Sequence, residues 1–324
     1  MDIKSIAIIG AGMMGKMIAF VFSSKYHVGV FDVVPQDVIG GIREAAGELL
    51  DRGILSADEL ELRLSRISFT GQLDDSLISG ADLVVEAVFE DMELKQKTFA
   101  QLEDICREDA IFCTNTSVMS PSEISRFLRH RGRFAATHFW NPAHLIPLVE
   151  VVVSDATTPE TAQAIIGILE DVGKKPILCK KDVPGFIANR LQHALWREAI
   201  YMVENGIADP KTVDDACKYG PGLRWPVLGP MENSDLVGIE LTSSIQEYIL
   251  KSLADNHEPS YLIKEMLDRG DLGMKTGKGW QEWTPEQITA LTAGLREHLV
   301  EYAARQLTMD NGQWTIDCVH GDCL

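Results

Sequence analysis

The sequence contains no apolar run of about 18 residues, so we expect no transmembrane helix. Basic residues are scarce: 30 Lys and Arg against 48 Asp and Glu give a formal net charge of −18. This balance argues against nucleic acid or an anionic membrane as a partner, because both are bound through clustered cations. The six cysteines are scattered without a CxxC pair, so we expect neither a metal site nor a disulfide framework, and a reducing cytoplasm fits.

Apolar residues make up 45% of the 324 positions, which indicates a globular chain of two domains. The apolar residues 6–9 are too short for the core of a signal peptide, and we interpret them as part of the first strand. Strands are predicted where short apolar runs occur, at residues 5–10, 27–32, 66–71, 82–88, 111–117, 134–140, 148–154 and 175–181. Amphipathic stretches separate the early ones, as at 37–53 and 93–109, so the pattern predicts an α/β fold with a parallel, doubly wound sheet of Rossmann type.

The pattern changes after "KKDVPGF", and helical patterns follow. They cover residues 189–206, 209–220, 234–253, 260–270 and 284–306. We therefore expect a dinucleotide-binding domain over residues 1–183 and an all-helical C-terminal domain over residues 184–324.

The first predicted strand runs into "GAGMMG", which places Gly10, Gly12 and Gly15 in GxGxxG spacing at the start of a predicted helix. Such a loop lets the backbone approach a pyrophosphate, which the helix N-terminus then binds. Met13 and Met14 lie inside this cofactor-binding loop and are expected to pack at the helix start. A plain glycine turn is the alternative interpretation of the motif.

Asp32 ends the second predicted strand, where a carboxylate accepts hydrogen bonds from the adenosine ribose. The same carboxylate repels a 2′-phosphate, and no Arg or Lys follows before Arg43. The sequence therefore predicts NAD as the cofactor, in preference to NADP.

Three polar residues point to chemistry at the carboxyl edge of the predicted sheet. Ser117 and His138 each follow or end a predicted strand, and Glu150 interrupts the apolar run "LVEVVVS". A buried carboxylate needs a partner, and Glu150 can accept from one ring nitrogen of His138, leaving the other to take a proton. The alternatives are a polar pair in the core for His138 and Glu150, and a helix cap for Ser117.

The ordered motifs "GAGMMG", "VVEAVFED", "NTS", "HFWNP…LVEVV", "DVPGFIANRL" and "LGMKTGKGW" resemble those of the 3-hydroxyacyl-CoA dehydrogenase family over roughly residues 5–283. The resemblance implies a Rossmann-type domain followed by a helical domain that forms a homodimer. It implies His138 as general base, Glu150 as its orienting partner, and Ser117 and Asn189 as hydrogen-bond donors to the reacting oxygen. NAD contacts are implied at Glu90, Lys95, Asn115, Ser117, Asn141 and Lys275.

Two departures from the family pattern concern the substrate. Lysines that hold CoA in the family are missing from residues 37–53, where Arg43 and Arg52 stand among acidic residues. Arg224, in "GPGLRWPVLGP", looks like the arginine of relatives that act on free hydroxy acids, and it can bind a carboxylate by two parallel bonds. The alternative role of Arg224 is a structural salt bridge.

The sequence thus favours an NAD-dependent enzyme that transfers a hydride between NAD and the β-carbon of a small free 3-hydroxy acid. A 3-hydroxyacyl-CoA is the alternative substrate. A non-catalytic NAD-binding protein is the alternative from a different class, because a fold does not dictate a function.

Overall fold

The computed structural model describes residues 3–308, and the chain forms two compact units. Of the described residues, the first unit contains 3–187 and 295–308, and the second unit is Ala188–Gly294. The junction lies close to the expected boundary at Val183. The end of the last helix belongs to the first unit because Val300 is buried in that unit's core.

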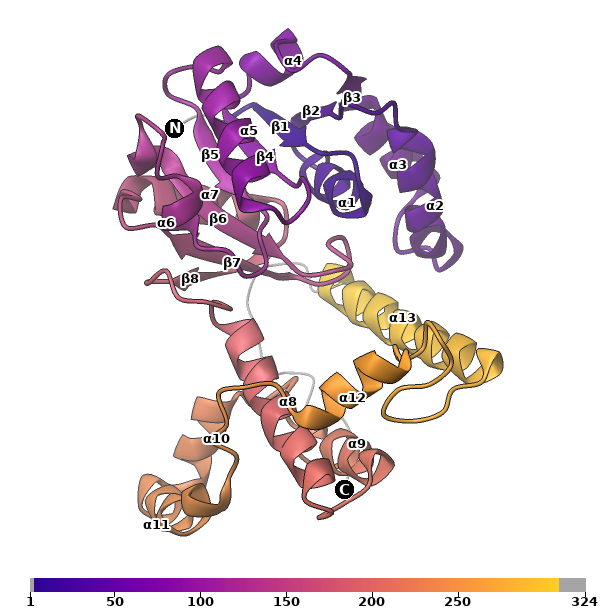
Figure 1. Ribbon diagram of the computed structural model, residues 1–324. Coiled ribbons are helices and arrows are strands. Elements are labelled where there is room, and N and C mark those ends of the chain that lie inside the picture. Colours follow the sequence, from indigo (N-terminus) through magenta and orange to yellow (C-terminus); the bar gives the residue numbers. More distant parts are fainter. Residues whose placement is uncertain (1–2, 309–324) are drawn as a thin grey trace. The chain divides into compact units, whose positions relative to one another are not determined.

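The first unit is built around one eight-stranded sheet, shown in Figure 1. Its strand order is β3-β2-β1-β4-β5-β6-β7-β8. The strands are β1 (Ser5–Ile9), β2 (His27–Phe31), β3 (Ile67–Thr70), β4 (Leu83–Glu86), β5 (Ile111–Thr114), β6 (Phe134–Phe139), β7 (Leu148–Val153) and β8 (Lys175–Cys179). Each falls on an apolar run from which a strand was predicted, and a Rossmann-type sheet is confirmed.

The expectation of a parallel sheet needs one correction. β6 and β7 pair antiparallel, whereas all other neighbours pair parallel. Only residues 140–147 connect these two strands, and a parallel crossover needs about a dozen residues or more. The short connection therefore forces the chain to turn back, which places Glu150 directly beside His138 in the register.

Two helix layers cover the sheet of the first unit. One apolar cluster joins it to α1 (Met13–Phe22), α2 (Val38–Asp51), α3 (Ala57–Ser65) and α7 (Pro159–Asp171). A second cluster joins the opposite face to α4 (Ser76–Ser79), α5 (Met92–Ile105) and α6 (Pro121–Ile124). Burial on both faces explains why most of these strands are continuously apolar rather than alternating.

Side-chain caps mark where these helices begin. Asp37 accepts from Gly40 N at 2.7 Å before α2, and Asp91 accepts from Leu94 N at 2.8 Å before α5. Ser120 caps α6 in the same way. Such caps satisfy backbone donors that a helix start leaves unpaired.

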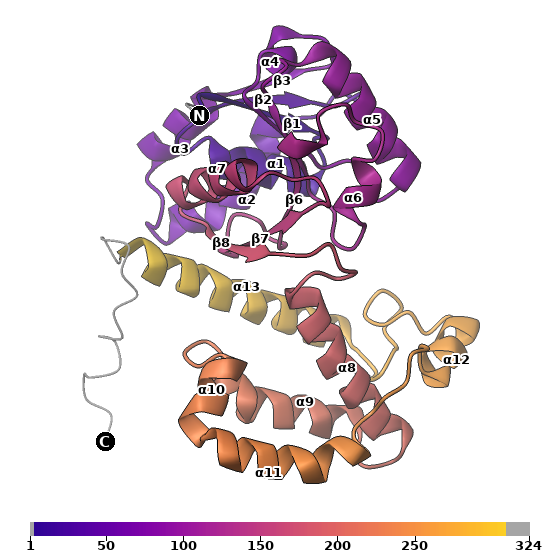
Figure 2. The same ribbon diagram turned by 90° about the vertical axis from the view of Figure 1, so that its left-hand side faces the viewer.

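The second unit contains the helices α8 (Ala188–Glu204), α9 (Pro210–Tyr219), α10 (Pro230–Val237), α11 (Ile239–Ile249) and α12 (Tyr261–Arg269) (Figure 2). Short 3-10 turns occur at Pro221–Leu223 and Leu250–Ser252, and another at Arg131–Arg133 in the first unit. The helix α13 (Pro285–Thr308) follows. The helical C-terminal domain is confirmed.

The stretch expected as one helix over residues 234–253 is broken. Gly238 adopts a φ of 100° and separates α10 from α11. Glycine tolerates this conformation at little cost, so it ends one helix and starts the next. Among the described residues, no helix combines the length and the hydropathy that spanning a membrane would require.

Candidate active site

The glycine loop lies at the carboxyl end of β1. Gly10 has a φ of 106°, and a Cβ there would meet Ala87 O at 2.7 Å. A Cβ on Gly15 would lie 1.8 Å from Gly10 O, so only glycine lets α1 pack this closely. At Gly12, which precedes α1, a Cβ would meet nothing within 4 Å, and no side chain caps the helix. This open helix N-terminus fits a bound pyrophosphate.

Asp32 follows β2 and faces the same loop. Its Oδ2 accepts from Ala11 N at 2.8 Å, and its Oδ1 accepts from Val34 N at 3.0 Å. These bonds fix the carboxylate beside the glycine loop, and each oxygen has a second lone pair for a ribose hydroxyl. Met14 packs partly against the core, whereas Met13 is 65% exposed, so only Met14 has the packing role expected for both.

A buried charge cluster connects the ends of β4 and β5. Lys95 and Glu86 are both 0% exposed, and Lys95 Nζ donates to Glu86 Oε1 at 2.8 Å. Glu86 also accepts from Thr114 Oγ1 at 2.6 Å and from Val88 N at 2.7 Å. Burial raises the pKa of Glu86, although the charge of Lys95 opposes this rise. Lys95 was expected among the NAD contacts, and the structure places its ammonium inside this cluster.

Glu90 links the cluster to the loop after β5. Its Oε2 lies 3.3 Å from Lys95 Nζ, and its Oε1 accepts from Ser117 N at 2.9 Å and from the hydroxyl of Thr116. Burial works to raise the pKa of Glu90, but these hydrogen bonds and the charge of Lys95 outweigh it, so the pKa is lowered. The backbone that carries Ser117 is therefore held by an ionised carboxylate, and Ser117 itself is exposed.

Asn115 joins the ends of β5 and β6. Its Oδ1 accepts from Phe139 N at 2.9 Å, and its own N–H donates to Glu86 O at 2.7 Å. This bridge ties the end of β6, which carries His138, to the ends of β4 and β5. The bond to Phe139 occupies the side-chain oxygen of Asn115, a residue that we expected to contact NAD.

His138 and Glu150 form the expected pair. They face each other across β6 and β7, and His138 Nδ1 lies 2.8 Å from Glu150 Oε2. His138 is 5% exposed and Glu150 0%. Glu150 Oε1 accepts from Ile187 N at 2.9 Å, and Trp140 Nε1 reaches Oε2 at 3.4 Å. Because an ionised carboxylate can only accept, Nδ1 is the donor in this bond.

Sequence reasoning missed Glu86, Trp140 and Phe186. Glu86 interrupts an apolar strand just as Glu150 does, so the same signal could have found it. Trp140 and Phe186 both pack their rings against His138, with centroids 5.7 and 5.8 Å away. Both residues lie in motifs used for the family resemblance, but nothing in their residue type indicates this contact.

Four further residues were predicted at the site, one in a loop of the first unit and three in the second unit. Asn141 is exposed in the loop between β6 and β7. Asn189 is the second residue of α8, Arg224 follows a short turn after α9, and Lys275 lies in the turn 273–278; all three belong to the second unit. Their roles toward NAD and substrate stay predictions.

The first unit defines a class of protein. A doubly wound sheet, an open helix N-terminus after β1 and an acidic residue after β2 make a dinucleotide-binding domain. A buried imidazole–carboxylate pair lies at the same edge of the sheet, and such a pair can transfer protons as a general acid or base.

Comparison with known proteins identifies the family. Residues 5–183 match the NAD binding domain of 3-hydroxyacyl-CoA dehydrogenase, and residues 185–283 match the C-terminal domain of the same enzyme. The chain belongs to the 3-hydroxyacyl-CoA dehydrogenase family. It is an oxidoreductase, and its cofactor is NAD.

Relatives in this family act on different substrates. The 5-formyl-3-hydroxy-2-methylpyridine 4-carboxylate 5-dehydrogenase of Mesorhizobium japonicum is 32% identical over 92% of this chain and 96% of its own. The mitochondrial hydroxyacyl-coenzyme A dehydrogenase of Homo sapiens is 32% identical over 87% of this chain and 91% of its own.

Solved structures of enzymes with both kinds of substrate have folds similar to that of this chain. A crystal structure described as the same pyridine carboxylate dehydrogenase, an NAD+ dependent dismutase, has a TM-score of 0.85 and 30% identity, covering 96% of this chain and 100% of the other. The (S)-3-hydroxybutyryl-CoA dehydrogenase of Ralstonia eutropha has a TM-score of 0.74 and 29% identity, covering 87% and 100%.

Proposed function

We propose that the protein interconverts a hydroxyl and a carbonyl on a small free 3-hydroxy acid, with His138 as the acid–base group. The observation that carries the proposal is the buried His138–Glu150 pair, with 2.8 Å between Nδ1 and Oε2, at the sheet edge that also carries the glycine loop. NAD, when bound, supplies the hydride acceptor.

The chain's own residues then handle the proton. In the oxidation direction, His138 Nε2 takes the proton of the substrate hydroxyl. Glu150 stabilises the imidazolium through Nδ1, while the N–H of Ile187 keeps the carboxylate oriented. Ser117 and Asn189 orient the reacting oxygen. In the reduction direction, the imidazolium returns the proton to the carbonyl oxygen.

The pairing of the arginines supports a free acid rather than a CoA thioester as the substrate, in two ways. Arg43 pairs with Glu61, and Arg52 lies 3.5 Å from Glu48 and 3.4 Å from Glu297, so the cations of this helix face are already neutralised. Arg224, in contrast, is exposed and has no carboxylate partner within the second unit, all of whose residues are described. The relative that acts on a pyridine carboxylate supports the same choice.

The competing substrate is a 3-hydroxyacyl-CoA, and the relatives that act on such thioesters favour it. An NADH-linked panel separates the two candidates by comparing acetoacetyl-CoA with free keto and hydroxy acids, including sugar acids and betaines. Replacing Arg224 by Met should raise KM for a free acid by about 1.5–3 kcal/mol, or about 10- to 150-fold. A KM effect confined to the thioester would contradict our choice.

Replacing His138 by Gln tests the acid–base role directly. General acid–base catalysis contributes about 10²–10⁴-fold, so turnover should fall by that factor. NAD affinity should stay unchanged, because the glycine loop and Asp32 are untouched. Turnover equal to that of the unmodified enzyme would remove His138 from the mechanism, and no turnover by either protein on any substrate would favour a non-catalytic NAD-binding role.

We also propose that the second unit pairs with a second copy of this chain. Its helices α8 to α12 contain no buried residue, and they expose many large apolar side chains, including Trp196, Met231, Leu236 and Tyr248. Exposed apolar surface on this scale marks an interaction site. Sedimentation should give about twice the chain mass of 35.9 kDa, and a monomer would contradict the proposal.

A further inference from the structure

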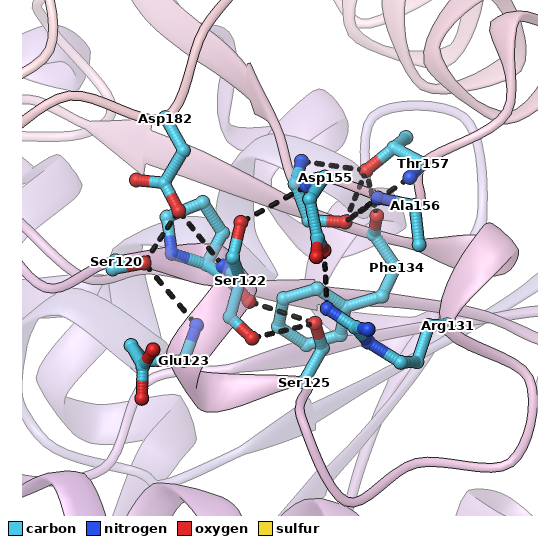
Figure 3. A network of polar contacts seen from close by, with 12 residues as sticks. Ser120, Ser122, Glu123, Ser125, Arg131, Phe134, Asp155, Ala156, Thr157 and Asp182 are labelled. Carbon is cyan, nitrogen blue, oxygen red and sulfur yellow. Dashed lines mark hydrogen bonds and ion pairs between the residues drawn. The ribbon is translucent and has the colours of Figure 1, made fainter.

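The segment that follows β8, residues 182–187, is attached to the candidate active site at both of its ends. At the first end, the carboxylate of Asp182 accepts from the hydroxyl of Ser120 and from Ser122 N, the latter at 3.0 Å. Figure 3 shows this carboxylate beside both serines at the start of α6. Ser120 is the cap of α6 and lies three residues after Ser117. Asp182 therefore fixes the far side of the loop that carries Ser117, whose near side is held by Glu90.

At the other end, the segment contacts the His138–Glu150 pair. Ile187 N donates to Glu150 Oε1 at 2.9 Å, while the second oxygen, Oε2, binds His138. Phe186 is 1% exposed, and its ring meets the imidazole edge-on with centroids 5.8 Å apart. The same six residues thus supply a donor to the carboxylate and one wall for the imidazole.

The backbone of Phe186 is strained. Its φ is 52°, and among residues 3–308 it is the one non-glycine residue with a positive φ. Large side chains avoid this conformation, and it persists where the surrounding structure requires it, often at functional sites. Here the turn places the Phe186 ring in the core and the next N–H on Glu150. Gly185, with a φ of 76°, takes the preceding part of the turn without strain.

We propose that residues 182–187 are a positioning segment that fixes the Ser117 loop and the His138–Glu150 pair in position relative to each other. Asp182 and Phe186 are its positioning residues: Asp182 acts through the start of α6, and Phe186 acts through the imidazole against which it packs. This inference rests on the proposed function. It states which residues give the acid–base pair its orientation, and misplacement of a catalytic group by about 1 Å can cost on the order of 100-fold in rate.

The test compares D182N and F186L with a matched control, D155N. Asp155 belongs to the same polar network, where its N–H binds Ser122 Oγ and its exposed carboxylate pairs with Arg131 (Figure 3). It makes no contact with the Ser120 cap among the bonds of that network. D182N and F186L should lower kcat by about 10- to 100-fold, with NAD affinity and melting temperature close to those of D155N. S120A should reproduce D182N, and the double variant should lose no more than either single one.

A second readout requires no substrate. The proton shared by His138 Nδ1 and Glu150 should give a downfield ¹H resonance, which H138Q assigns by deleting it. F186L should shift or broaden this signal, and D155N should leave it unchanged. The proposal is overturned if F186L leaves the signal in place, or if D182N and F186L lower kcat no more than D155N does. Loss of turnover in H138Q together with neutral D182N and F186L would overturn this proposal alone, whereas an H138Q enzyme with full turnover would overturn the proposed function.

Discussion

Replacing Lys95 by Met tests the buried charge cluster, which organises the sheet edge beneath the glycine loop. Lys95 and Glu86 are both fully buried and lie 2.8 Å apart. In the variant, Glu86 keeps its bonds from Thr114 and Val88 but loses its counter-charge. Removing one partner of a buried ion pair costs about 3–5 kcal/mol, because the other charge is left uncompensated. We expect K95M to lose stability on that scale at neutral pH.

The stability of K95M should also depend on pH in a defined direction. Burial raises the pKa of Glu86 above its usual 4.5, and Lys95 acts against that rise. Without Lys95, the folded state holds the Glu86 proton more tightly than the unfolded chain does. The variant should therefore be least impaired below about pH 4.5 and lose stability as the pH rises, until Glu86 ionises in the folded state. Urea unfolding at several pH values, followed by tryptophan fluorescence, measures this trend.

Two controls separate the buried pair from the rest of the cluster. E90Q alters the other partner of Lys95, but Glu90 is 37% exposed and 3.3 Å away, so its loss should cost less than about 1 kcal/mol. The double variant K95M/E86Q contains neither charge and should recover most of the loss of K95M. The reasoning is refuted if K95M unfolds like the unmodified protein at every pH, or if the double variant is no more stable than K95M.

Two further predictions concern the same unit. Burial and the nearby charges of Lys174 and Arg296 lower the pKa of His144 from 6.5 to about 4, so the unfolded chain takes up the proton first and stability is lost as the pH falls from 6.5 toward 4. Between pH 7.5 and pH 5 the protonation of His144 should lower the free energy of unfolding by about 2 kcal/mol. The free energy of unfolding of H144Q should fall by about 2 kcal/mol less over the same pH range. G12A should weaken NAD binding at least about tenfold in calorimetry, because the added Cβ enters the position expected for the pyrophosphate. The melting temperature should stay constant, because the Cβ meets no protein atom within 4 Å. Unchanged NAD affinity would place the cofactor elsewhere.

Local signals in the sequence were sufficient to predict the elements of the sheet and the acid–base pair. Most of the strands carry continuous apolar runs, because both of their faces are covered; β3 and β8, the first and last strands in the sheet order, are less apolar and partly exposed. The glycine spacing encodes its own backbone geometry, as the φ of Gly10 shows. Glu150 could be paired with His138 because a carboxylate in an apolar strand needs a partner, and His138 lies near the end of the preceding strand.

Features set by tertiary contacts could not be predicted in this way. The antiparallel direction of β7 is an exception, because residues 140–147 are too few for a parallel crossover and this length can be read from the sequence once the strand ends are known. The burial of Lys95 depends on where α5 packs against β4, and its residue type suggests an exposed side chain. The positive φ of Phe186 has no local signal, because phenylalanine is a residue that normally avoids it.

Two buried carboxylates, Glu86 and Glu150, interrupt apolar strands at this sheet edge. Their partners differ, and the difference indicates which carboxylate stabilises the fold and which can affect the rate. Glu86 pairs with Lys95, an amine with no part in the proposed proton transfer, so its stabilisation is constant through the reaction. Glu150 pairs with the imidazole of His138, which gains a positive charge in the proposed reaction when it takes the substrate proton. An interaction that is stronger in the transition state than in the ground state accelerates a reaction, and one that is equal in both does not. Of these two buried acids, only Glu150 can therefore contribute directly to the rate, and Glu86 contributes by holding the sheet edge in place.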